Sequence, residues 1–191
     1  NLGGGSCYDQ ETFDEIARVA KTLGCATHID GARIFNASIA TGVDVARMCE
    51  HYDSVSICFS KGLGAPVGSV LVGSAAFIAK AHRWRKMFGG GWRQAGMLAS
   101  ACLYALDHHV ERMSEDHERA RRIATMLNDL PMFTVDLNTV QTNMIYAQTV
   151  EPAAKVVEQY AANGIDMFDL SEHRLRVVVH LHITEEDVQR F

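Results

Sequence analysis

CATHIDG, residues 25–31, and SVSICFSK, residues 54–61, are the two stretches that decide the fold. Each is a short, largely apolar run, typical of a strand buried on both faces of a sheet, and each ends near a charged side chain, Asp30 or Lys61. A helix predicted near 43–51 separates them, and the order strand, helix, strand predicts a parallel βαβ unit. Parallel strands end at one edge, where α/β sheets bind ligands, so we expect Asp30 and Lys61 at that edge.

The neighbouring sequence extends this unit. Residues 9–23 carry apolar side chains at helical spacing and stop before Gly24, which predicts an amphipathic helix. Residues 67–73 predict a third strand after a glycine-rich turn over 61–64. A parallel crossover takes about a dozen residues, so we expect this strand to run antiparallel. Residues 75–88 then predict another helix.

A long helical stretch over 94–130, bent between 109 and 114, is the natural domain boundary. We expect residues 1–112 to form part of a large α/β domain and 113–191 a smaller α+β domain. In the second domain, strands are predicted at 133–137, 143–147 and 175–183 and a helix at 151–163.

The two ends of the chain predict a fragment of a longer protein. The first residue is Asn1 rather than Met, and residues 184–187, Thr-Glu-Glu-Asp, predict a helix N-cap with an acid three residues on. Because that helix would not yet have ended at Phe191, we expect a chain truncated at both ends.

The composition is that of an ordinary globular protein: 191 residues, 48% apolar and 21% charged, with a net charge of −5. Basic residues are dispersed, so no nucleic-acid partner is expected. No run approaches the ~20 apolar residues of a membrane span, and no signal-like segment opens the chain, so no membrane partner is expected. The five cysteines form no CxxC pair, which favours a reducing, cytoplasmic location.

Asp30 and Lys61 together meet the minimal demands of pyridoxal phosphate (PLP). A carboxylate can keep the pyridine nitrogen protonated, and a lysine can form an imine with the cofactor aldehyde. The alternative is a turn-capping Asp30 and a solvated loop Lys61, which is the commoner situation for either residue alone. The pattern by itself leaves both interpretations open.

Longer blocks of sequence distinguish between these two interpretations of Asp30 and Lys61. HIDGARIFN at 28–36, SKGLGAPVG at 60–68 and GGGWRQAG at 89–96 closely resemble, in order, blocks of the low-specificity L-threonine aldolases, which are PLP enzymes of the threonine aldolase and β-eliminating lyase family. The resemblance continues through QTN at 141–143 and RVVVH at 176–180. It therefore covers essentially the whole chain.

The resemblance implies the PLP-dependent transferase-like fold of the aspartate aminotransferase type, fold type I. That fold has a three-layer α/β/α large domain and a smaller α+β C-terminal domain. Residues 1–112 would be the C-terminal part of the PLP-binding large domain, and 113–191 would be the truncated small domain.

The resemblance also implies roles for five residues. Lys61 would be the catalytic Schiff-base lysine that holds PLP, and Asp30 would pair with the pyridine nitrogen. Arg33 and Arg176 would bind the substrate carboxylate, because a guanidinium meets a carboxylate bidentately. Arg33 would also lie beside the cofactor, although a structural salt bridge near Asp30 is its alternative. Ser60 would hydrogen-bond the phosphate or simply cap the turn.

Four further residues remain candidates. Arg174 shares the expected strand face of Arg176 two residues away, but the motif favours Arg176. Arg93 would contact the cofactor or a neighbouring subunit, or be solvated. His180 and His182 have a metal-like spacing, yet no carboxylate or cysteine cluster joins them, so no metal is expected. The remaining histidines considered are expected to be structural or surface residues: His28, His51, His108 and His109.

The implied activity is PLP-dependent aldol cleavage of a β-hydroxy-α-amino acid, L-threonine or L-allo-threonine, to glycine and acetaldehyde. A homo-oligomer, dimer or tetramer, is implied as well. The alternatives are a PLP-dependent β-eliminating lyase of another amino acid, or a catalytically incomplete fold-type-I fragment that serves as a binding or oligomerisation module. The family's phosphate cradle and ring-stacking residue cannot be assigned in this sequence.

Overall fold

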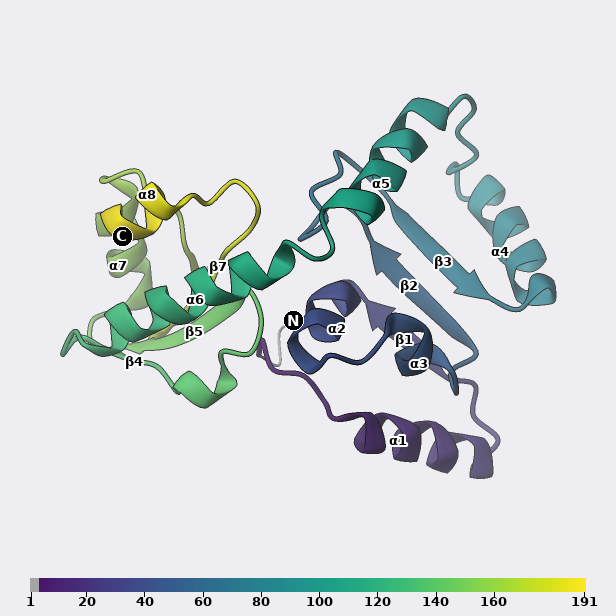
Figure 1. The fold of residues 1–191 in the computed structure, drawn as a ribbon, viewed down its shortest axis with the longest axis horizontal. Helices are drawn as coiled ribbons and strands as arrows, with labels where there is room; N and C mark the ends of the chain where they lie inside the picture. Colours follow the sequence, from purple (N-terminus) through teal and green to yellow (C-terminus); the bar gives the residue numbers. More distant parts are fainter. Residues whose placement is uncertain (1–3) are drawn as a thin grey trace. The chain divides into compact units, whose positions relative to one another are not determined.

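A computed structural model describes residues 4–191, which form two compact units (Figure 1). One unit spans residues 8–111, and the other combines residues 4–7 with 112–191. The first contains α1 (Gln10–Thr22), β1 (His28–Gly31), α2 (Ile34–Thr41), α3 (Val45–Cys49), β2 (Ser54–Cys58), β3 (Ser69–Gly73), α4 (Ala75–Met87) and α5 (Gly96–His108). The second contains α6 (Met113–Asn128), β4 (Phe133–Thr134), the 3-10 helix η1 (Leu137–Thr139), β5 (Met144–Thr149), α7 (Ala153–Ala161), β6 (Phe168–Ser171), β7 (Arg174–Val178) and α8 (Glu185–Arg190).

The sheet of the first unit has the order β1-β2-β3. β1 and β2 are parallel, and β2 and β3 are antiparallel, which confirms both strand directions expected from the spacing. The short hairpin connection between β2 and β3 cannot make a crossover, whereas α2 and α3 fill the connection between β1 and β2 (Figure 1). The carboxyl ends of β1 and β2 therefore meet at one edge.

A polar clamp fixes the start of the two parallel strands. The Asp53 carboxylate accepts hydrogen bonds from the backbone N–H of Thr27 at 2.8 Å and from the Thr27 hydroxyl at 3.0 Å. These two bonds lower the pKa of Asp53. In return, the Thr27 hydroxyl accepts a bond from the Asp53 backbone N–H at 3.0 Å. The clamp thus holds the register in which His28 faces Ser54.

The helices of this unit follow the apolar pattern, with one addition. α1 begins where Asp9 caps it, since its carboxylate accepts the Thr12 backbone N–H at 2.6 Å. α2 was not predicted; it ends at Gly42, whose φ of 70° suits glycine. The expected helix near 43–51 is the shorter α3.

The core of the first unit lies on one face of the strands. Ile29, Ile34, Met48 and Val55 form a buried cluster that joins β1 and β2 to α2 and α3. Burial alternates along β1, so the expectation of a strand buried on both faces is wrong for β1. It agrees with β2, whose residues are all buried or half-buried. β3 is exposed along its whole length.

The long helical stretch is confirmed as two helices, α5 and α6, with a break at residues 109–112. Within residues 4–191, every helix is too short or too polar to cross a membrane.

The second unit is a four-stranded antiparallel sheet, β4-β5-β7-β6, covered by α6 and α7 (Figure 1). β6 was not predicted, and β7 is shorter than the expected strand over 175–183. α8 has the predicted N-terminus: Thr184 and Asp187 form a reciprocal capping box. One continuous core joins helices and sheet: Ala120, Ile123, Ala124, Leu127, Phe133, Val135, Val140, Ile145, Ala147, Ala153, Val156, Met167, Leu175, Val177, Val179 and Val188.

A buried ion pair holds the start of α6. The Asp116 side chain is fully buried and accepts two hydrogen bonds from Arg112, at 2.6 and 3.1 Å. Arg119 approaches the same carboxylate at 3.8 Å. A buried carboxylate is tolerated only when it is paired in this way.

Candidate functional site

Asp30 is the third residue of β1 and its side chain is exposed. It lies within the strand, whereas the sequence placed it just after the strand end. One carboxylate oxygen accepts the backbone N–H of Ala32 at 3.2 Å. The next residue, Gly31, is packed so closely that an added Cβ would lie 2.8 Å from the Ser56 carbonyl oxygen. A glycine is therefore needed where β1 and β2 approach each other beside Asp30.

Ser60 and Lys61 lie in the loop between β2 and β3, and both side chains are exposed. β2 ends at Cys58, earlier than expected, because the Phe59 carbonyl accepts the Ala65 N–H at 3.0 Å and the chain turns back. The Lys61 carbonyl accepts the Gly64 N–H at 2.9 Å, which closes the predicted glycine turn. The Lys61 amine makes no hydrogen bond or ion pair with another residue of the described chain.

Asp30, near the carboxyl end of β1, and Ser60 and Lys61, in the loop after β2, thus lie at the same edge of two adjacent parallel strands, where the pattern placed Asp30 and Lys61. Their roles remain predictions. Leu63, two residues after the lysine, is 1% exposed and anchors the turn. Its carbonyl is hydrogen-bonded to the His109 imidazole at 2.7 Å. No spacing in the sequence indicates this contact between residues far apart in the chain.

Arg33 follows Asp30 by three residues, at the N-cap of α2. Its side chain is half-buried, and it is already engaged within the described chain. Its backbone carbonyl begins the helix by accepting the Ala37 N–H at 3.1 Å. The structure therefore agrees with a position near the strand edge and leaves both interpretations of Arg33 open.

Arg176 lies in the other unit, on β7. Arg174 and Arg176 share one face of β7, since the intervening Leu175 is buried, as expected. The Arg176 guanidinium lies 4.9 Å from the ring centroid of Phe168, and that of Arg174 lies 4.8 Å from the ring of Tyr146. Stacking of this kind holds a guanidinium in a defined plane. Arg176 Nε is buried and has no hydrogen-bond partner in residues 4–191.

The His-Leu-His segment is not on a strand, contrary to expectation. β7 ends at Val178, and His180 and His182 lie beyond it. The His182 backbone N–H donates to His180 Nδ1 at 3.3 Å, a turn contact that ends the extended run. Burial, and then the neighbouring His182, lower the pKa of His180. Over the described part of the chain, no three His, Cys, Asp or Glu side chains converge as metal ligands.

Arg93 is exposed and precedes α5. Its contacts with the cofactor or a neighbouring subunit remain predictions.

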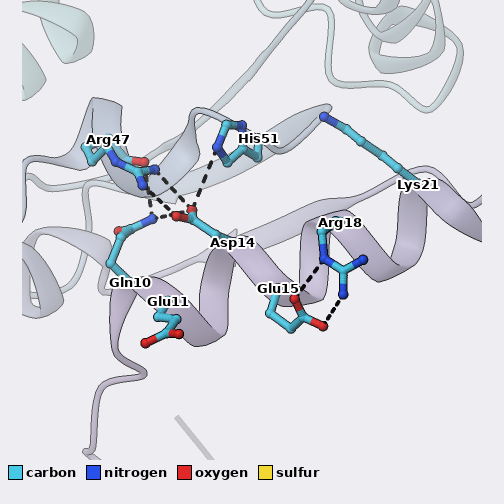
Figure 2. A pocket seen from close by; sticks show the side chains of 8 residues that line it. All are labelled: Gln10, Glu11, Asp14, Glu15, Arg18, Lys21, Arg47 and His51. Atoms are coloured by element: carbon cyan, nitrogen blue, oxygen red, sulfur yellow. Dashed lines mark hydrogen bonds and ion pairs between the residues drawn. The ribbon is translucent and has the colours of Figure 1, made fainter.

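A separate open cavity of about 630 Å³ lies on the surface of α1 and is charged (Figure 2). Asp14 is its centre and is paired with Arg47 at 2.5 Å. The hydrogen bond from Arg47 is the largest cause that lowers the pKa of Asp14 to about 2, and a bond from Gln10 adds to it. None of the predicted site residues lines this cavity. Its lining consists of Gln10, Glu11, Asp14, Glu15, Arg18, Lys21, Arg47 and His51. Its ion pairs tie α1 to α3, which is a structural role.

Comparison with known proteins agrees with the resemblance. The low-specificity L-threonine aldolase 1 of Arabidopsis thaliana is 43% identical over 97% of this chain and 53% of its own length. The low specificity L-threonine aldolase of Escherichia coli (strain K12) is 38% identical over 98% of this chain and 55% of its own length. The chain thus spans about half the length of the curated relatives it matches.

Solved structures match the fold. A Listeria monocytogenes protein assigned as an L-allo-threonine aldolase has a TM-score of 0.84 at 21% identity, over 98% of this chain and 56% of that one. The Leishmania major threonine aldolase has a TM-score of 0.75 at 16% identity, over 97% of this chain and 55% of that one. The expected fold type I is confirmed. Since the family model for beta-eliminating lyases also matches residues 1–150, the chain belongs to the beta-eliminating lyase family.

Proposed function

We propose that the intact protein is a PLP-dependent lyase that cleaves L-threonine or L-allo-threonine to glycine and acetaldehyde. One observation carries the proposal: exposed Asp30, near the carboxyl end of β1, and exposed Lys61, in the loop after β2, lie at the same edge of two adjacent parallel strands. Parallel α/β sheets bind ligands at this edge. The names of the relatives support the same activity, and because the chain spans about half their length, the activity is proposed for the whole protein.

The residues at the edge fit the cofactor chemically. The Lys61 amine is exposed and uncommitted within the described chain, so it is available to join the cofactor aldehyde. Asp30 is oriented by the Ala32 N–H and would hold a proton on the pyridine nitrogen. The Ser60 hydroxyl, also exposed, would donate to the phosphate. When bound, PLP supplies an electron sink for charge that develops at the substrate Cα.

The substrate is proposed to be held by arginines. Arg33 and Arg176 each present a planar guanidinium, which can bind the amino-acid carboxylate bidentately and orient the Cα–Cβ bond. Stacking on Phe168 supports this role for Arg176, because it limits the planes that the guanidinium can adopt.

The first test locates the lysine. The intact protein is loaded with PLP, reduced with borohydride and mapped by peptide mass. The pyridoxyl label is expected on Lys61 alone and is expected to vanish in Lys61→Ala, whereas Lys80→Ala, which removes an exposed lysine of α4, keeps it. A label at any other residue contradicts the proposal.

The second test identifies the reaction from its products. Incubation with L-threonine is expected to give glycine and acetaldehyde. Ammonia with 2-oxobutanoate would instead support the alternative of an eliminating lyase. An intact protein that gains no PLP absorbance would support a binding or oligomerisation module.

The proposal also includes a cytoplasmic homo-oligomer, dimer or tetramer, that acts on a small-molecule amino acid. Large apolar side chains exposed on α4 and α5 support self-association, among them Trp84 at 55% and Met97 at 83% exposure. Light scattering of the intact protein at several concentrations tests this part, and a monomer at all of them would contradict it.

A further inference from the structure

One face of α5 underlies the loop that carries Lys61. Cys102, Ala105 and His109 recur at spacings of three and four residues, so they project from one side of the helix end. The Cys102 thiol donates to the Val67 carbonyl at 3.5 Å. Ala105 is 1% exposed. The helix therefore contacts the loop near its exit at Val67 and, through His109, near the lysine.

The His109 contact is the closer of the two. Its Nδ1 lies 2.7 Å from the Leu63 carbonyl oxygen, in a half-buried position. A carbonyl can only accept a hydrogen bond, so Nδ1 is the protonated ring nitrogen and donates. The Tyr104 ring packs edge-on against the imidazole, with the centroids 5.5 Å apart, and limits its rotation.

We propose that His109 is a positioning residue for Lys61; this rests on the proposed function. The bond holds the backbone of Leu63, and the Gly64 N–H holds the carbonyl of Lys61 one turn away. The two bonds fix the backbone of the turn, whereas the Lys61 side chain makes no hydrogen bond or ion pair in the described chain. His109 thereby restricts the backbone from which the reactive amine extends.

Loss of the bond has a defined cost. The Leu63 carbonyl loses its donor, and the turn gains conformations in which the Lys61 amine is displaced from the cofactor aldehyde. A single hydrogen bond of this kind corresponds to a change of about fivefold to tenfold in an equilibrium constant. We expect the dissociation constant for PLP to rise, and kcat to fall, by about that factor. KM for the amino acid is expected to change little, because other residues are proposed to bind its carboxylate.

Four variants of the intact protein separate this bond from general packing. His109→Phe keeps a planar ring without the donor. His109→Asn places an N–H at the same distance along the side chain as Nδ1, whereas His109→Gln places it one bond further out. His108→Asn is the matched control, since His108 is the exposed neighbour at the same helix end and makes no hydrogen bond to the loop within residues 4–191. PLP affinity is measured by absorbance titration, and kcat and KM with L-threonine, well below the unfolding temperature.

The expected result is weakened PLP binding and a lower kcat in His109→Phe and His109→Gln, with His109→Asn and His108→Asn close to wild type. A merely structural role would not distinguish the Asn and Gln variants. Equal behaviour of those two, or wild-type PLP affinity in His109→Phe, would overturn the inference while the label remained on Lys61. A label elsewhere in the wild type would instead refute the proposed function.

Discussion

Replacement of Gly31 by alanine tests whether the edge of the sheet is built on a close approach of two strands. An ideal Cβ at this position would lie 2.8 Å from the Ser56 carbonyl oxygen, 3.2 Å from Val55 Cγ1 and 3.3 Å from Ile34 Cβ. The first of these atoms is backbone, and the other two belong to buried side chains. None of them is the free end of a flexible side chain, so β1 must move away from β2.

The size of the effect follows from these contacts. Addition of a methyl group to a packed site typically costs about 1–3 kcal/mol of unfolding free energy. The backbone contact favours the upper half of that range. Because Asp30 is the preceding residue, the same displacement moves its carboxylate, and PLP affinity is expected to fall together with stability.

The assay is urea unfolding of the intact protein, followed by circular dichroism, with PLP titration of the same samples. Gly96→Ala is the matched control, because an added Cβ there meets nothing within 4 Å and the residue opens α5. Its stability is expected to stay equal or to rise by less than about 1 kcal/mol. Gly31→Ala with the stability and PLP affinity of wild type would show that the strands are not packed as closely as described, and the reasoning would fail.

Two further predictions concern charges. Arg112→Leu leaves the buried Asp116 carboxylate without its bidentate partner and is expected to lower the unfolding free energy by about 3 kcal/mol, measured by urea unfolding. Glu15→Gln breaks an exposed ion pair and is the control; a loss in Arg112→Leu no larger than in this variant would contradict the prediction. The Arg47 bond lowers the folded-state pKa of Asp14 to about 2 from ~3.9, so its contribution is present above pH ~4 and is lost as the pH falls toward 2. Asp14→Asn is expected to flatten stability against pH in that window, and an unchanged acid slope would argue against the pair.

Much of the fold was predictable because local chemistry fixes it. The amphipathic α1 was evident from its apolar periodicity and from the glycine that follows it, and the break between α5 and α6 was expected within the long helical stretch. Strand directions in the first sheet followed from the helix between the first two strands and from the short connection before the third. The capping box at Thr184 was recognisable because its two partners lie three residues apart.

The elements and strand ends that the sequence did not predict depend on contacts with other parts of the fold. α2 and β6 lack a strong pattern of their own and form because the strands beside them supply a surface or an edge. Strand ends were misjudged at Cys58 and Val178, where hydrogen bonds in the following turns, rather than residue type, end the extended run.

For the candidate site, the sequence by itself determined which residues are the candidates: Asp30 and Lys61, each beside the end of an apolar run, and the blocks around them. Only the tertiary structure decided what holds them. The close packing at Gly31 and the His109 bond to Leu63 join segments far apart in the chain. Periodicity and spacing report neighbours along the sequence, whereas these contacts exist only once the strands and α5 have packed.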